Sequence, residues 1–193
     1  MGVVILSIYY FSEMSRGTGA AILLFFFCLC LLVETARLRS PDFNERMVKA
    51  WKPIMRTSEV NAMTGIPFYL ASNILAISIF PREIAALSIL ALAVVDAIAS
   101  LFGLLYGDLS VRLTHGKSLI GTMAGVIAVA IAIVIFGHIV GLPEKHLMTI
   151  ALVGGFSAAL AELLPSELDD NFTIPLISGC SMWIAAILLH VRF

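Results

Sequence analysis

The sequence predicts an all-α protein: a polytopic membrane bundle of about six transmembrane helices plus one interfacial amphipathic helix, in a single domain over residues 1-193. Hydrophobic residues make up 60% of the chain and charged residues only 13%, whereas about 25% of a soluble domain is charged. The mean hydropathy is +1.02. Charge this scarce cannot coat a water-facing surface, so lipid must be the solvent for much of the chain.

Six apolar runs approach the roughly 20 residues that a spanning helix needs. They cover residues 17-36, 60-79, 84-106, 119-140, 147-164 and 171-191. The apolar segment from Met1 to Phe11 is too short to span, has no preceding cation and is followed by no cleavage site. It is interpreted as an extension of the first span or as a membrane-surface segment.

Residues 42-56 are predicted to form the interfacial helix. Phe43, Met47, Trp51 and Ile54 recur at helical spacing, and charged residues occupy the other faces. That pattern is typical of a helix lying on anionic headgroups. An ordinary basic loop is the alternative.

The cations are concentrated in one loop. Residues 37-59 carry six of the twelve Lys and Arg residues, so the positive-inside rule places this loop in the cytoplasm. Counting spans then places loops 107-118 and 165-170 on the same face, as expected for a multi-pass membrane protein with cytoplasmic active-site loops. The net charge of −1 lacks the basic excess of nucleic-acid binders, so no nucleic-acid partner is expected.

Asp96 lies near the middle of the third span. A carboxylate in lipid is costly, so it is expected to face the bundle interior and to be functional. A structural hydrogen bond between helices is the alternative interpretation.

The second candidate site is the stretch His115-Gly116-Lys117-Ser118-Leu119-Ile120-Gly121-Thr122, at the start of the fourth span. A helix N-terminus offers free N–H groups to phosphate, and Lys117 adds a full charge. Val111 stands where a Walker A loop requires its first glycine, so the stretch is not that motif. A snorkelling lysine followed by a capping serine is the alternative.

The third candidate site is acidic. Glu162, Glu167, Asp169 and Asp170 fall within nine residues, followed by Asn171. Hard oxygen ligands of this kind suit Mg²⁺, which typically takes one or two carboxylates plus substrate phosphates. A solvated acidic loop with a helix cap is the alternative. Together the three sites indicate phosphoryl or nucleotidyl transfer, in which positioning and charge neutralisation dominate.

These residues, in this order, resemble the CTP-dependent lipid kinases, which include dolichol, phytol, farnesol and diacylglycerol kinases and are relatives of phosphatidate cytidylyltransferase. The resemblance rests on Glu34-x-x-Arg37, Asp96-x-x-Ala99, Gly116-Lys117-Ser118-x-x-Gly121-Thr122, Glu162 and the stretch from Asp169 to Pro175. It implies that the γ-phosphate of CTP is transferred, with Mg²⁺, to a lipid alcohol such as a polyprenol, phytol or diacylglycerol.

The resemblance also assigns roles. Asp96, Lys117 and Asp170 are the expected catalytic residues, and Asp170, Asn171, Glu162 and Asp96 are the expected metal ligands. The triphosphate is expected on Gly116, Lys117, Ser118, Gly121 and Thr122, and the lipid headgroup near Glu34, Arg37 and Asn44. The rival interpretations are synthesis of a CDP-lipid by a cytidylyltransferase-like enzyme and a small transporter or subunit without turnover. The sequence leaves open the acceptor alcohol, the choice between CTP, UTP and ATP, and the oligomeric state.

Overall fold

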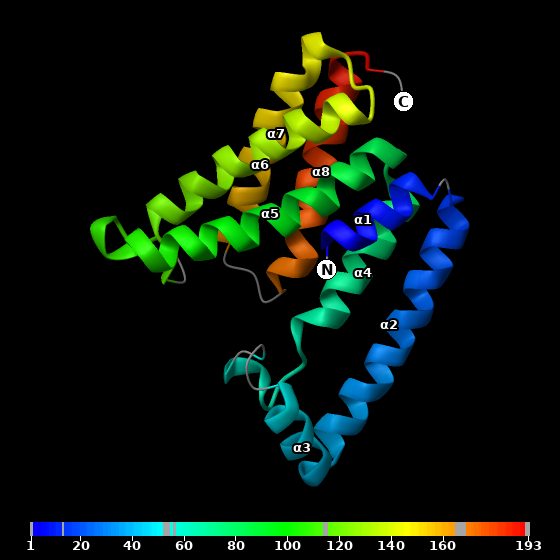
Figure 1. Ribbon diagram of the computed structural model, residues 1–193, viewed down its shortest axis with the longest axis vertical. Coiled ribbons are helices and arrows are strands. Elements are labelled where there is room, and N and C mark those ends of the chain that lie inside the picture. The colour runs from blue at the N-terminus through cyan, green and yellow to red at the C-terminus, as the bar shows by residue number, and fades with distance from the viewer. Residues whose placement is uncertain are drawn as a thin grey trace.

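The computed structural model describes residues 2–12, 14–51, 55, 57–113, 116–164 and 169–191. Their regular structure is helical (Figure 1): α1 (Gly2–Phe11), α2 (Arg16–Arg39), α3 (Pro41–Trp51), α4 (Gly65–Ile79), α5 (Arg82–Tyr106), α6 (Leu119–Ile139), α7 (Glu144–Leu163) and α8 (Asp170–Leu188). Two single 3₁₀ turns, η1 (Thr57–Glu59) and η2 (Gly107–Leu109), lie in the connections. The described residues contain no strand, only an isolated bridge between Arg112 and Ser118.

Five helices, α2 and α5 to α8, are long and apolar enough to cross a membrane, and α4 is a shorter apolar helix of 15 residues. The predicted all-α membrane bundle is confirmed. The second span begins at Gly65 and not at residue 60, because residues 57–64 form a turn and an extended segment. α3 forms the first part of the predicted interfacial helix, while residues 52-54 and 56 lie outside the described part of the chain.

The N-terminal segment is a separate helix. The chain leaves helical structure after Phe11, and the Ser15 side chain then caps α2 by accepting from the backbone N–H of Thr18. α1 packs against α5, and Nη2 of Arg82 donates to the carbonyls of Tyr9 and Tyr10 at 2.8 and 2.9 Å. The prediction that this segment extends the first span is therefore wrong.

α5 is the central helix, in contact with α1, α4, α6, α7 and α8. Its first half is buried almost completely. Small residues let its neighbours approach closely: a Cβ on Gly121 of α6 would lie only 2.6 Å from the carbonyl oxygen of Ala99 on α5. Tight helix contacts of this kind fix the positions of the loops at the ends of the bundle.

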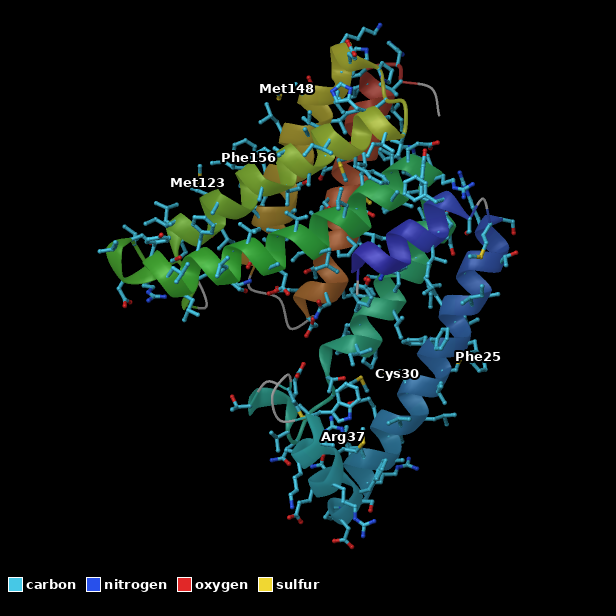
Figure 2. All side chains as sticks on the ribbon, in the orientation of Figure 1. Phe25, Cys30, Arg37, Met123, Met148 and Phe156 are labelled. Carbon is cyan, nitrogen blue, oxygen red and sulfur yellow. The ribbon has the colours of Figure 1, made fainter. Side chains whose placement is uncertain are left out.

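α2 stands apart at the edge of the bundle and packs mainly on α4 (Figure 1). Large apolar side chains such as Phe25 and Leu32 are 65% and 69% exposed, as suits a helix that faces lipid. Figure 2 shows Phe25 on the outer side of α2 and Arg37 turned inward toward α3. The space beside α2 becomes important below.

Candidate active site

Lys117 joins the ends of three helices. It lies just before α6, and its Nζ donates to the carbonyl oxygen of Glu162, near the end of α7, and to Oδ2 of Asp170, the first residue of α8, both at 2.7 Å. The same nitrogen lies 3.2 Å from Oε1 of Glu162. The Glu162 side chain is buried, whereas those of Lys117 and Asp170 are partly exposed. One ammonium group therefore neutralises two carboxylates drawn from distant parts of the sequence.

A pocket of about 180 Å³ opens beside this lysine, and we call it the polar pocket. From α5 it takes Ala99, Ser100 and Gly103, and the remaining lining residues are Arg112, Gly116, Lys117, Ser118, Thr122 and Glu162. Gly116 has a φ of +74°, in the left-handed region that glycine adopts without steric cost. The start of α6 borders this pocket, but the first backbone N–H groups of the helix, at residues 119, 120 and 121, already donate to groups within the protein.

The hydroxyls near the start of α6 have local partners. Oγ of Ser118 accepts from the backbone N–H of Gly121 at 3.1 Å, so it is the helix cap. The hydroxyl of Thr122 donates to the carbonyl of Ser118 at 3.1 Å. Gly121 itself lies in the α5–α6 contact and is not part of the pocket lining. Of the expected phosphate-binding set, Gly116, Lys117, Ser118 and Thr122 line the polar pocket, while Gly121 has a packing position.

Arg112 is a pocket residue that the sequence reasoning did not select. Its guanidinium donates to the carbonyl of Gly116 at 3.1 Å and to the carboxylate of Asp108 at 2.7 Å, and its side chain is half exposed. The available signal was a second cation five positions before Lys117 in the same loop. Arg112 gives the polar pocket a second positive charge.

A second and much larger cavity, of about 850 Å³, lies beside α2. We call it the lateral groove. Its walls come from α1, α2, α3, α4 and α5 and are mostly apolar. Its polar lining is limited to Tyr9, Glu34, Arg37, Glu59, Thr64, Tyr69, Asp96 and Asn171.

Asp96 lines the lateral groove on the face of α5 that also borders the polar pocket. On α5, Leu92, Ala93 and Asp96 line the lateral groove, and Ala99, Ser100 and Gly103 line the polar pocket. Residues three and four apart share a helix face, so one face of α5 borders both cavities. Ala99 is about 4.5 Å beyond Asp96 along the helix axis. Asp96 is also within electrostatic range of Glu162, so the acid predicted in span three lies near the lysine and the acidic residues.

The first residues of α8 have different partners. Oδ1 of Asp169 accepts from the backbone N–H of Asn171 at 2.9 Å and from its side-chain amide at 2.6 Å, so Asp169 caps the helix. Asp170 instead contacts Lys117. Asn171 borders the lateral groove and not the polar pocket. Glu167 lies outside the described residues.

The carboxylates of this site fit a divalent cation. Within the described ranges no three His, Cys, Asp or Glu side chains are grouped closely enough to hold a metal by themselves. Mg²⁺ needs only one or two carboxylates when phosphates complete its shell. Oε2 of Glu162 is buried and lacks a hydrogen-bond partner among the described residues, and Asp170 is partly exposed nearby. Glu162 and Asp170 are therefore the side chains that can hold Mg²⁺ beside a bound triphosphate.

Glu34, Arg37 and Asn44 form an internal network at the far end of α2. Arg37 is fully buried, and its guanidinium contacts Oε2 of Glu34 and Oδ1 of Asn44, each at 2.8 Å. It also donates to the backbone carbonyls of Glu59, Val60 and Ala62. Glu34 accepts from the backbone and the hydroxyl of Thr64, at 3.0 and 3.2 Å. These residues hold the segment before α4 against α2, and Glu34 and Arg37 also border the groove.

Comparison with known proteins identifies the relatives of this chain. It is 34% identical over 170 residues to CTP-dependent diacylglycerol kinase 1 of Eremothecium gossypii, covering 79% of this chain and 54% of that kinase. It is 28% identical over 160 residues to CTP-dependent diacylglycerol kinase 1 of Schizosaccharomyces pombe, covering 78% and 73%. The chain belongs to the CTP-dependent lipid kinase family.

Another member of this family, the probable chloroplastic phytol kinase 1 of Glycine max, is 29% identical over 161 residues, covering 77% of this chain and 51% of that protein. The chain thus spans between about half and three quarters of the length of these relatives. No protein-family model matches the chain, and no solved structure matches it. The resemblance read from the motifs is confirmed.

Proposed function

We propose that this chain is a CTP-dependent kinase that transfers the γ-phosphate of CTP to the hydroxyl of a membrane lipid alcohol, with diacylglycerol as the first candidate acceptor. The observation that carries the proposal is the junction at Asp96. A small pocket lined by two cations and the carboxylate of Glu162 and a large apolar groove both border a single face of α5. A kinase acting on a lipid needs these two cavities, because one substrate is polyanionic and the other is apolar.

The polar pocket is the proposed nucleotide site. Lys117 and Arg112 supply the positive charge that a triphosphate requires. When bound, Mg²⁺ neutralises charge on the phosphates, and Glu162 and Asp170 would hold it. Lys117 already contacts both carboxylates, so it is placed to bridge them to the nucleotide.

The lateral groove is the proposed acceptor site. It accommodates the hydrocarbon chains, and the acceptor hydroxyl lies at Asp96, beside the polar pocket. Asp96 accepts the hydroxyl proton as the lipid oxygen forms its bond to the γ-phosphorus. The bond between that phosphorus and the β–γ bridging oxygen breaks, and CDP leaves with both bonding electrons.

The distribution of Lys and Arg residues indicates which end of the bundle faces the cytoplasm. The starts of α6 and α8 and the end of α7 meet at Lys117, and a Cβ on Gly65 at the start of α4 would collide with Asn171. The polar ends of these helices therefore lie at one end of the bundle. Residues 37-59, with half of the Lys and Arg residues, connect α2 to α4 at that same end. We propose that this end faces the cytoplasm, where CTP is available.

The test is label transfer in lipid nanodiscs that contain either diacylglycerol or phytol. CTP labelled at the γ-phosphate should transfer label to lipid, whereas CTP labelled at the α-phosphate should not. Glu162→Gln should abolish transfer, and Glu144→Gln is the matched control, because Glu144 is exposed at the opposite end of the same helix. Transfer of the α-label would instead show a cytidylyltransferase, and no transfer with either lipid would contradict the kinase proposal.

A further inference from the structure

Two polar side chains of α4, Tyr69 and Asn73, are buried and have no partner outside their own pair among the described residues. Asn73 has no exposed surface, and neither its Nδ2 nor its Oδ1 has a hydrogen-bond partner in the described part of the structure. Tyr69, one turn earlier, is 9% exposed, and its hydroxyl is also unpartnered there. The polar ends of the two side chains lie close together. A polar group left unsatisfied inside a membrane bundle is costly, because no water reaches it.

The serine hydroxyls of α4, by contrast, do have hydrogen-bond partners. Ser72 donates to the carbonyls of Tyr69 and Asn171 at 2.9 and 2.7 Å, and Ser78 donates to that of Ile74 at 2.7 Å. On α4, the buried polar atoms that lack hydrogen-bond partners therefore belong to Tyr69 and Asn73, which lie on one face of the helix. We call these two residues the stripe. A local feature of this kind points to a partner that is a ligand.

Of the two stripe residues, Tyr69 forms part of the wall of the lateral groove, while Asn73 is buried beside it and is not a lining residue. Tyr69 and Ile77 line the groove, and Asn73 lies between them, one turn from each. Asp96 lines the same groove. An acceptor whose hydroxyl lies at Asp96 therefore passes this stripe. Asn73 has no exposed surface in the absence of lipid, so the flanking side chains must shift to admit a ligand group to its amide.

The chemistry of the pair selects an acceptor of hydrogen bonds. A tyrosine hydroxyl and an asparagine amide both donate, and the asparagine oxygen can accept from the tyrosine. The amide N–H₂ of Asn73 can then donate to a ligand group that accepts hydrogen bonds but cannot donate them. An ester carbonyl is such a group. An isoprenoid alcohol consists of a hydroxyl group and a hydrocarbon chain. It therefore has no hydrogen-bond acceptor apart from the hydroxyl that receives the phosphate.

We propose that Tyr69 and Asn73 form a specificity subsite that binds an ester carbonyl of a glycerolipid acceptor. The proposal rests on the proposed kinase function for its activity test. Tyr69 and Asn73 act here as positioning residues, because they orient the acceptor and do not touch the transferring phosphoryl group.

The test compares two acceptors that differ only in the carbonyl: a 1,2-diacylglycerol and the 1,2-dialkylglycerol diether of equal chain length, in matched nanodiscs. Wild-type kcat/KM should favour the diester by roughly three- to tenfold, the value of one hydrogen bond. Asn73→Leu and Tyr69→Phe should bring this ratio to about one while turnover of the diether and KM for CTP stay unchanged. Tyr106→Phe is the matched control, since Tyr106 lies outside both cavities.

A ratio near one in the wild type, an unchanged ratio in Asn73→Leu, or an equal loss on both acceptors would overturn the subsite. Displacement of a fluorescent diacylglycerol from the purified protein gives a readout that needs no turnover. The diester should compete better than the diether against wild type and equally well against Asn73→Leu. If that difference is seen without phosphate transfer, the subsite stands and the kinase proposal fails. Equal competition against wild type would overturn the subsite.

Discussion

Replacing Lys117 by Met separates two roles that the structure gives to one side chain. Lys117 neutralises Glu162 and Asp170 in the protein, and it is the proposed ligand of the triphosphate. Met keeps the length and the apolar stem and removes the charge. Both stability and activity should fall, and the two losses have different causes.

The size of the stability loss follows from the contacts. Removing one partner of a buried ion pair costs about 3–5 kcal/mol, because the other charge is left without compensation. The Glu162 side chain is only 7% exposed, but that of Lys117 is 25% exposed, and water can therefore reach the site. We expect a loss of about 2–3 kcal/mol in the free energy of unfolding, or roughly 4–12 °C in the midpoint of thermal unfolding. The loss in kcat/KM for CTP should be about 100-fold or more, the typical effect of removing one preorganised donor.

The double variant Lys117→Met with Glu162→Gln decides between the roles. Glu162→Gln removes the charge that needs compensation, so thermal unfolding in detergent should recover at least half of the lost stability. Transfer of γ-label from CTP should fall to background, as in Glu162→Gln alone, since a proposed phosphate ligand and a proposed metal ligand are both missing. A double variant that regains wild-type transfer would show that Lys117 and Glu162 only neutralise each other, and both the nucleotide and the metal assignment would be lost.

Three further predictions follow from single sites. Asp96→Asn should lower kcat by about 100-fold or more, as for loss of a general base, with KM for CTP within about twofold; steady-state kinetics over CTP concentration checks this. Gly121→Ala should cost about 1–3 kcal/mol by overpacking, because the new Cβ would lie 2.6 Å from the carbonyl of Ala99. Gly125→Ala should cost less, since its nearest neighbour, at 3.0 Å, is a side-chain methyl group; equal shifts in thermal unfolding would contradict the packing argument. Arg37→Lys should lower the unfolding midpoint more than either glycine variant, because one ammonium cannot replace two guanidinium nitrogens with five acceptors, while KM for CTP stays unchanged.

Most of the fold prediction was based on the lengths of the apolar runs in the sequence. A spanning helix needs a long apolar run, and this constraint gave the helices within a few residues at most ends. Counting spans also placed Lys117, Glu162 and Asp170 at one end of the bundle, although 45 and 53 residues separate the lysine from the two acids. The second span was placed too early because residues 60-64 continue the apolar composition, while their backbone is held by Arg37 and Glu34.

Other features depend on packing that the sequence expresses weakly or not at all. Gly121 belongs both to the stretch expected to bind phosphate and to a G-x-x-x-G pattern with Gly125 that indicates helix packing, and the approach of α5 gives it a packing position. The charge of Arg37 indicates an exposed headgroup contact, yet five internal acceptors allow the guanidinium to be fully buried. Tyr69 and Asn73 are neutral and therefore do not interrupt an apolar run. The lateral groove exists because α2 stands away from α5. The distance between two helices depends on how they pack, and it cannot be predicted from the sequence of either helix alone.

The junction at Asp96 also bears on how a kinase avoids transferring phosphate to water. Lys117, Arg112 and Glu162 line the polar pocket, where we propose that the nucleotide enters from solution. Asp96 borders the apolar side, so hydrocarbon displaces water from its surroundings once a lipid fills the groove. The acceptor hydroxyl is then the one nucleophile held against that carboxylate. Since Asp96 and Ala99 are one turn apart on α5, the separation between the proposed acceptor and the proposed phosphate site would be set by that helix. A loop could not hold that separation as firmly, and this accounts for the position of the acid within a span, where burying a charge is most costly.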